Sequence, residues 1–190
     1  MASKDEILEA AHMVFMKYGI EKSTLDDIAK ECGFKQQALY YYFKNKDDLI
    51  EQLMYHIIND IKQDTFGGIS DIEGPVEKIR FYMINQLYAY KKHKRFIDLL
   101  RNTDIPLKYL DMAEEIKQSL FCATYEKVKE IINEGVEKGV FKVDSIDSLT
   151  YLLISTTAGY GYTILVRDLN IDIEEIVEQT INILLHGIER

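Results

Sequence analysis

Residues 24–46 read TLDDIAKECGFKQQALYYYFKNK, a segment that predicts two short helices joined by a tight turn. The helices are expected over 25–32 and about 36–43, because apolar residues recur there at helical spacing. Gly33 supplies the backbone freedom that a sharp turn needs, and Phe34 is expected to fill the space between the helices. This arrangement is a helix-turn-helix, which favours a protein that reads DNA.

The composition is typical of an all-helical protein without disulfides. The chain has 190 residues, 47% of them hydrophobic, with only two prolines and ten glycines, which favours helices over strands. Two distant cysteines are too few for a disulfide framework or a zinc site. The first residues include acids, and no window reaches the roughly 18 apolar residues of a membrane span. We therefore expect a cytoplasmic protein that has no membrane partner.

The net charge of −9 is unevenly distributed along the chain. Residues 1–46 contain seven lysines and seven acids, so the negative excess lies entirely within residues 47–190. The segment Gly33–Lys46 contains three lysines and no acid. A basic face on an acidic protein still attracts phosphates and orients the protein on a duplex. Taken alone, these lysines are equally consistent with an ordinary solvated surface.

Helix caps frame the helix-turn-helix. A first helix is expected over 4–18, with Ser3 and Glu6 as its capping box and Gly19 as its stop. Thr24 opens the next helix with a second capping box that uses Asp27. Its hydroxyl could also bind a phosphate, because a helix N-terminus attracts anions.

The run Tyr-Tyr-Tyr-Phe that ends at Phe43 cannot point inward as a whole, since successive helical residues face different directions. Phe43 and part of Tyr42 are expected in the core, which leaves Tyr40 and Tyr41 toward solvent. Exposed tyrosines beside lysines can contact sugar, a thymine methyl or phosphate. Lys46 falls in the first turn of the following helix, where a cation is unfavourable unless an anion is near. We therefore expect Lys46 to face a DNA phosphate.

The rest of the chain predicts a larger helical domain, residues 47–190, behind a reading head of residues 1–46. The all-α fold should contain about nine helices, with the later ones at about 46–65, 75–92, 96–102, 108–138, 146–167 and 173–188. The helix that starts at Lys46 is the only continuous link between the two domains, so a signal should pass through it. Small residues at 155–161 fit close packing against another helix. A dimer interface explains them, and so does a contact within the chain.

Residues 7–50, ILEAAHMVFMKYGIEKSTLDDIAKECGFKQQALYYYFKNKDDLI, resemble the DNA-binding region of TetR-type (tetracycline-repressor-like) transcriptional regulators. The resemblance is most specific in the run L-Y-Y-Y-F-K-x-K after a glycine-bearing turn. It implies a homodimer with a three-helix head and a body that binds ligand and dimerises through the helices at 146–167 and 173–188. It also implies DNA contacts by Thr24, Lys35, Gln36, Gln37, Tyr40, Tyr41 and Lys46.

The sequence departs from the family pattern at Lys35-Gln36-Gln37, where Ser-Lys-Gly or a similar triplet is common. The departure removes a normal N-cap and puts a bulky amide at the groove, so the target sequence is left open. Gln37, or alternatively Gln36, could pair with an adenine edge, which is worth roughly 1–3 kcal/mol of discrimination.

No catalytic or metal-binding constellation is evident, because the four histidines are isolated and no phosphate-binding glycine loop or nucleophile elbow occurs. We expect no enzyme activity, no metal and no cofactor. The later domain is unusually rich in tyrosine, and each buried hydroxyl needs a partner. This predicts a pocket for a small, largely apolar effector, lined by Ile58, Tyr82, Gln86, Tyr90, Tyr109, Met112, Phe121, Tyr125 and Tyr160.

These observations favour a regulator, acting as a repressor, that binds a palindromic double-stranded DNA operator as a dimer. An effector in the body would tilt the helix at 46–65 and change the spacing of the two heads. The alternative is a constitutive DNA-binding or scaffolding protein with no small-molecule effector. A cavity in the body would distinguish the two.

Overall fold

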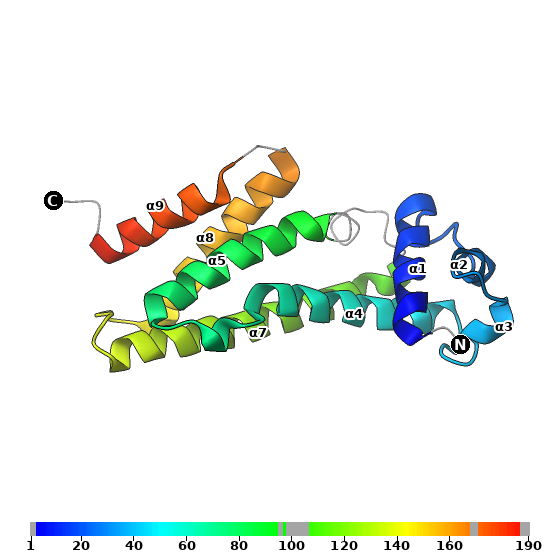
Figure 1. Cartoon of the computed structure of the whole chain (residues 1–190), viewed down its shortest axis with the longest axis horizontal. Coiled ribbons are helices and arrows are strands. Elements are labelled where there is room, and N and C mark those ends of the chain that lie inside the picture. The colour runs from blue at the N-terminus through cyan, green and yellow to red at the C-terminus, as the bar shows by residue number, and fades with distance from the viewer. Residues whose placement is uncertain (1–2, 95–96, 98–106, 168–170, 187–190) are drawn as a thin grey trace. The chain divides into compact units, whose positions relative to one another are not determined.

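The computed structural model describes residues 3–94, 97, 107–167 and 171–186, and every regular element in these ranges is helical (Figure 1). The all-α prediction is confirmed for this part of the chain. The predicted helix at 96–102 lies outside the described residues, apart from Ile97. The elements are α1 (Lys4–Tyr18), α2 (Leu25–Glu31), α3 (Gln36–Leu39), α4 (Lys46–Phe66), η1 (Ile69–Asp71), α5 (Pro75–Lys92), η2 (Leu107–Tyr109), α7 (Leu110–Glu137), α8 (Ile146–Arg167) and α9 (Ile173–His186).

The chain divides into two compact units. The first contains residues 1–60 and 95–117, and the second contains residues 61–94 and 118–190. The helices α4 and α7 each contribute residues to both units. The first unit is thus larger than the predicted head, because it includes most of α4 and the short turn η2. The domain boundary after residue 46 stays a prediction.

Local sequence signals account for the bounds of α1. The Glu6 N–H donates to Ser3 Oγ at 3.1 Å, and the Ser3 N–H donates to Glu6 Oε2 at 2.8 Å. At the other end, Gly19 has a φ of 81° and its N–H donates to the carbonyl of Phe15 at 2.9 Å. One side of α1 is buried, as the apolar spacing predicts, through Ile7, Ala10, Ala11, Val14 and Phe15.

The core of the second unit lies where α5 packs against α8 and α9 (Figure 1). Its most buried side chains come from four helices and include Tyr82, Met83, Leu87, Val128, Ile132, Leu153 and Val177. By length and composition α8 is apolar enough to cross a membrane. In this fold, however, its residues Leu153, Ile154 and Ile164 belong to the core.

The two glycines of α8 have different surroundings. A Cβ added at Gly161 would lie 2.2 Å from Cδ2 of Tyr90, whereas a Cβ at Gly159 would meet nothing within 4 Å. Gly161 therefore lets α8 approach Tyr90 on α5, which is a contact within the chain. Of the small residues assigned to a dimer interface, Gly161 is explained by packing inside the protein, while Gly159 is exposed.

Replacing Gly161 by alanine should lower the free energy of unfolding by about 1–3 kcal/mol, because the half-buried Tyr90 ring must move. Gly159→Ala is the matched control and should raise stability by up to about 1 kcal/mol through helix propensity. Denaturant unfolding of both variants at one protein concentration measures the difference. Equal stability of the two variants would show that the Tyr90 ring gives way without cost.

Candidate nucleic-acid interface

The helix-turn-helix is formed by α2, a glycine turn and α3. Thr24 caps α2 as predicted: the Asp27 N–H donates to Thr24 Oγ1 at 3.2 Å, and the Thr24 N–H donates to Asp27 Oδ2 at 2.9 Å. Gly33 has a φ of 71°, a left-handed conformation that glycine adopts readily. The Phe34 N–H then donates to the carbonyl of Ala29 at 2.8 Å and closes the turn.

Two details of this motif were predicted wrongly. The second helix ends at Leu39, and the chain continues as a turn before the buried Phe43. Phe34 is 37% exposed, so it does not fill the space between the helices. Its backbone N–H closes the turn, and the fully buried apolar residues of the motif are Ile28, Ala29, Leu39 and Phe43. Lys35 caps α3 without a side-chain hydrogen bond, consistent with the missing serine.

The aromatic run divides as the sequence predicts. Tyr40 is 53% and Tyr41 is 75% exposed, whereas Tyr42 is half-buried and Phe43 is buried. The Tyr41 and Tyr42 rings meet edge to face, with centroids 4.9 Å apart. Two large exposed phenols are therefore held on a local segment whose buried residues fix its position.

Five exposed polar or aromatic residues near α3 define what we call the reading surface: Lys35, Gln37, Tyr40, Tyr41 and Lys44. Gln36 is half-buried, and its amide donates to the Tyr40 hydroxyl at 3.5 Å. Gln37 is therefore the better placed of the two amides to meet a base edge. The reading surface combines cations for phosphates with amide and phenol groups for base and sugar edges.

Lys46 lies beside this surface, but its ammonium group already has negative partners. Its Nζ donates to the carbonyl oxygens of Ile20 and Ser23, both at 2.5 Å, and to that of Glu21 at 3.3 Å. Burial lowers the pKa of Lys46, and the charge of Lys108 adds to the shift. The three carbonyls supply the negative charge that was expected from a DNA phosphate. The phosphate contact of Lys46 therefore rests on the resemblance alone.

Asp47, which follows Lys46, joins α4 to η2. Asp47 Oδ1 accepts a hydrogen bond from Lys108 Nζ at 2.7 Å and another from the Tyr109 hydroxyl. Lys108 first and Tyr109 second hold the pKa of the Asp47 carboxyl below its usual value. Sequence reasoning missed this contact, because no spacing rule relates residues 62 positions apart.

The predicted effector-pocket residues are shared between the two units, and several have partners within the chain. Tyr109 bonds Asp47, the Tyr125 hydroxyl donates to Asp147 at 2.6 Å, and the Tyr160 hydroxyl lies 3.0 Å from Thr180 Oγ1. Phe121 is 44% exposed. The first unit contains Ile58, Tyr109 and Met112, and the second contains Tyr82, Gln86, Tyr90, Phe121, Tyr125 and Tyr160.

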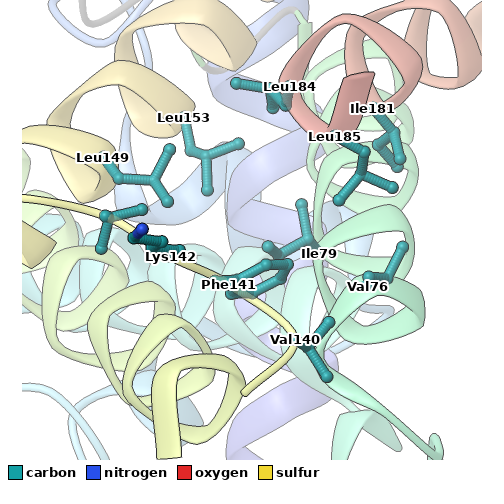
Figure 2. Close-up of a pocket in the computed structure, with 11 residues that line it drawn as sticks. Val76, Ile79, Val140, Phe141, Lys142, Leu149, Leu153, Ile181, Leu184 and Leu185 are labelled. Atoms are coloured by element: carbon teal, nitrogen blue, oxygen red, sulfur yellow. The ribbon is translucent and has the colours of Figure 1, made fainter. Parts of the chain in front are cut away.

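A different apolar pocket of about 320 Å³ lies in the second unit (Figure 2). It opens between α5, α8, α9 and the loop after α7. Lys142 is the one charged side chain among its described lining residues, and none of the nine predicted pocket residues lines it. Its walls are Val76, Ile79, Val140, Phe141, Lys142, Val143, Leu149, Leu153, Ile181, Leu184 and Leu185.

Comparison with known proteins extends the likeness beyond the helix-turn-helix. Residues 7–53 match the family model described as bacterial regulatory proteins, tetR family. The uncharacterized HTH-type transcriptional regulator YerO of Bacillus subtilis is 27% identical over an alignment of 200 positions, which covers 98% of this chain and 66% of YerO. The HTH-type transcriptional repressor KstR2 of Mycolicibacterium smegmatis is 24% identical over an alignment of 195 positions, which covers 97% of this chain and 90% of KstR2.

The same fold occurs in a solved structure of FadR from Bacillus subtilis in complex with stearoyl-CoA. The TM-score is 0.69 at 19% sequence identity, with 98% of this chain and 100% of FadR covered. The family match includes every residue of the reading surface, and the relatives cover nearly the whole chain. This family consists of DNA-binding regulators and not of enzymes. Residues 7–53 thus match the DNA-binding region of the tetR family, and over nearly its whole length the chain is similar to HTH-type transcriptional regulators.

Proposed function

We propose that the protein is a cytoplasmic repressor that leaves its DNA operator when a small, largely apolar effector binds. The reading surface carries the proposal, because two exposed tyrosines stand there beside lysines and no acid occurs within Gly33–Lys46. Lys35 and Lys44 would neutralise phosphates, and Gln37 would meet a base edge in the major groove. Repression as the outcome is supported by the name of the relative KstR2.

A palindromic operator requires two reading heads, and we propose a homodimer formed through α8 and α9. Both helices expose large apolar side chains: Leu152, Tyr162, Val166, Ile183 and Leu185 are each between 40% and 53% exposed. Exposed large apolar side chains gathered on two helices are typical of a protein interface, and a twofold contact would bury them on both chains. Sedimentation of the purified chain checks the dimer, and a monomer at DNA-binding concentrations would contradict it.

The apolar pocket in the second unit is the site that we propose for the effector. Its lining is aliphatic and aromatic apart from Lys142, whose ammonium could meet an acidic head group. The structural neighbour FadR was solved with stearoyl-CoA, so a protein of this fold can hold an acyl ligand. An apolar chain with one acidic group is therefore the effector class that the pocket fits.

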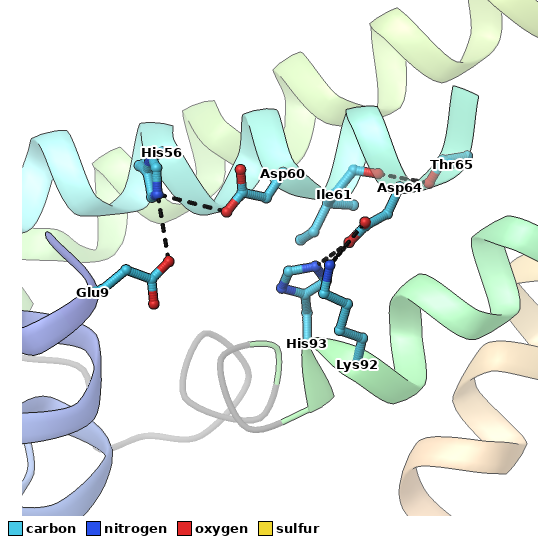
Figure 3. A network of polar contacts seen from close by, with 8 residues as sticks. All are labelled: Glu9, His56, Asp60, Ile61, Asp64, Thr65, Lys92 and His93. Atoms are coloured by element: carbon cyan, nitrogen blue, oxygen red, sulfur yellow. Dashed lines mark hydrogen bonds and ion pairs between the residues drawn. The ribbon is translucent and has the colours of Figure 1, made fainter. Parts of the chain in front are cut away.

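Polar contacts within the second unit join the end of α5 to the end of α4. Asp64 near the end of α4 accepts hydrogen bonds from Lys92 Nζ at 2.8 Å and lies 2.7 Å from Nε2 of the buried His93 (Figure 3). Both partners belong to the end of α5, whose start lines the pocket. A shift of α5 on effector binding would therefore act on α4, and through α4 on the reading head.

The tyrosines of the reading surface give the first test. Tyr40→Ala should weaken binding to an operator fragment selected from genomic DNA by about 10-fold or more, because a phenol contact to the duplex is lost. Its melting temperature should stay near that of the wild type, since the side chain is 53% exposed. Tyr55→Ala is the control, an exposed tyrosine on α4 outside the reading surface. A large drop in melting temperature would instead make Tyr40 a structural residue.

Lys46 and Lys44 form a matched pair that separates folding from DNA contact. Lys46→Met should lower the free energy of unfolding by about 1–3 kcal/mol, because three carbonyl oxygens lose their donor. Lys44→Met should leave stability unchanged and reduce the salt dependence of DNA binding by about one unit of slope. Chemical unfolding and binding titrations at several salt concentrations measure both. The opposite pattern would make Lys46 a phosphate contact, as the family resemblance implies.

Decanoate serves as a probe of the effector proposal, with uncharged decanol as its control. Decanoate should raise the melting temperature and release the operator, and Leu149→Trp should abolish both effects by filling the pocket. Gln86→Leu should leave both effects of decanoate intact, because Gln86 does not line this pocket. If Gln86→Leu alone abolishes release, the effector binds at the site predicted from the tyrosines. Operator binding that resists a wide screen of lipophilic acids would favour the constitutive alternative.

A further inference from the structure

We propose that Glu9, His56 and Asp60 bind a divalent transition-metal ion, and that their donor atoms fit zinc best. All three belong to the first unit and lie outside the reading surface. Glu9 comes from α1, while His56 and Asp60 stand one turn apart on the same face of α4 (Figure 3). A histidine and a carboxylate at this spacing on a helix can hold one ion between them.

The distances within this cluster are too long for hydrogen bonds. His56 Nε2 lies 3.7 Å from Glu9 Oε1 and 3.6 Å from Asp60 Oδ2, whereas an N–H···O hydrogen bond spans roughly 2.7–3.2 Å. Two carboxylates thus converge on one ring nitrogen, and that nitrogen could donate to only one of them. The two negative charges also repel each other, which a cation between them would relieve.

The same distances suit a metal ion. Two donors that each lie about 2.1 Å from a tetrahedral zinc ion are about 3.4 Å apart. The two distances from His56 Nε2 exceed this by only a few tenths of an ångström, and all three donor atoms lie within 4.8 Å of one another. One imidazole and two carboxylates leave a fourth position for water. Magnesium fits less well, because it prefers six oxygen ligands.

The cluster is accessible to an ion and is partly held in place by the fold. The His56 side chain is 24% exposed, against 44% for Asp60 and 62% for Glu9. The competing arrangement is a protonated His56 paired with both acids and no metal. Such exposed ion pairs contribute about 1 kcal/mol or less and would not respond to zinc.

A bound ion would join α1 to α4. Because α1 packs on α2, and α4 begins directly after the reading surface, the ion would fix how these helices of the first unit lie against one another. We therefore expect zinc to change the affinity for DNA. This consequence rests on the proposed function, whereas zinc binding itself does not.

The test is a calorimetric titration of the full chain with zinc chloride after removal of metals by a chelator. We expect one ion per chain and a zinc-dependent rise in melting temperature. His56→Gln and Asp60→Asn should each weaken zinc binding by at least about 10-fold. When cobalt is added in place of zinc, the wild type should show the visible absorption of tetrahedral cobalt, and both variants should lack it. Glu51→Gln is the control, because Glu51 is an exposed acid of α4 outside the cluster. Acid should weaken binding, since a protonated imidazole cannot ligate.

Zinc binding of equal strength in the wild type and His56→Gln would place the ion elsewhere on this acidic chain and overturn the proposal. The absence of saturable binding would overturn it too. If zinc binds as expected but leaves operator affinity unchanged, the site stands and its coupling to DNA is rejected. If the proposed DNA-binding function is itself wrong, the wild-type chain will select no operator, and this result does not depend on whether zinc binds.

Discussion

Three backbone carbonyls between α1 and α2 converge on the ammonium group of Lys46, and the reading head depends on this contact. A partly buried carbonyl without a donor costs roughly 1–3 kcal/mol, so the loop at 20–23 needs this cation. Lys46 belongs to the first turn of α4. The start of α4 therefore holds the loop that leads into α2, and with it the turn and α3. Lys46 thus helps to tie the orientation of the reading surface to α4, together with the Lys44 N–H, which donates to Asp48 Oδ2 of α4 at 2.7 Å.

Further polar contacts follow along α4. Asp47 joins its first turn to η2, His56 and Asp60 face α1, and Asp64 holds the end of α5. Apolar residues such as Leu53, Ile57 and Ile61 are buried, which keeps the polar contacts at the margins of the packed face. Polar contacts are directional, so a small rotation of α4 would break some of them and not others. A helix held in this way is suited to two discrete positions, which is what a repressor with an effector needs.

Sequence patterns predicted the contacts between residues a few positions apart and missed the contacts between residues that are distant in the chain. The capping boxes of Ser3 and Thr24 and the exposure of Tyr40 and Tyr41 follow from spacing of a few residues, and all are confirmed. The Gly161 contact with Tyr90 and the Asp47 bond to Tyr109 join distant positions, and no periodicity relates them. The sequence also predicts a ligand beside the tyrosines of the second unit, because no periodicity reveals their distant partners within the chain. Their hydroxyls did need partners, but Asp147 and Thr180 of the chain itself supply them for Tyr125 and Tyr160.

Because the Lys46 ammonium group is bound by backbone carbonyls, the attraction of the protein to DNA must come from other residues. With a net charge of −9, the chain as a whole is repelled by a duplex, so attraction must come from the acid-free segment Gly33–Lys46. Two of its three lysines remain exposed, Lys35 and Lys44. Few phosphate contacts give weak nonspecific binding, and the acidic remainder of the chain weakens it further. Specific binding then has to rest on the amide of Gln37 and the two exposed tyrosines. Of these residues, Gln37 belongs to the triplet where this sequence departs from the family pattern, whereas Tyr40 and Tyr41 belong to the run that resembles it most closely.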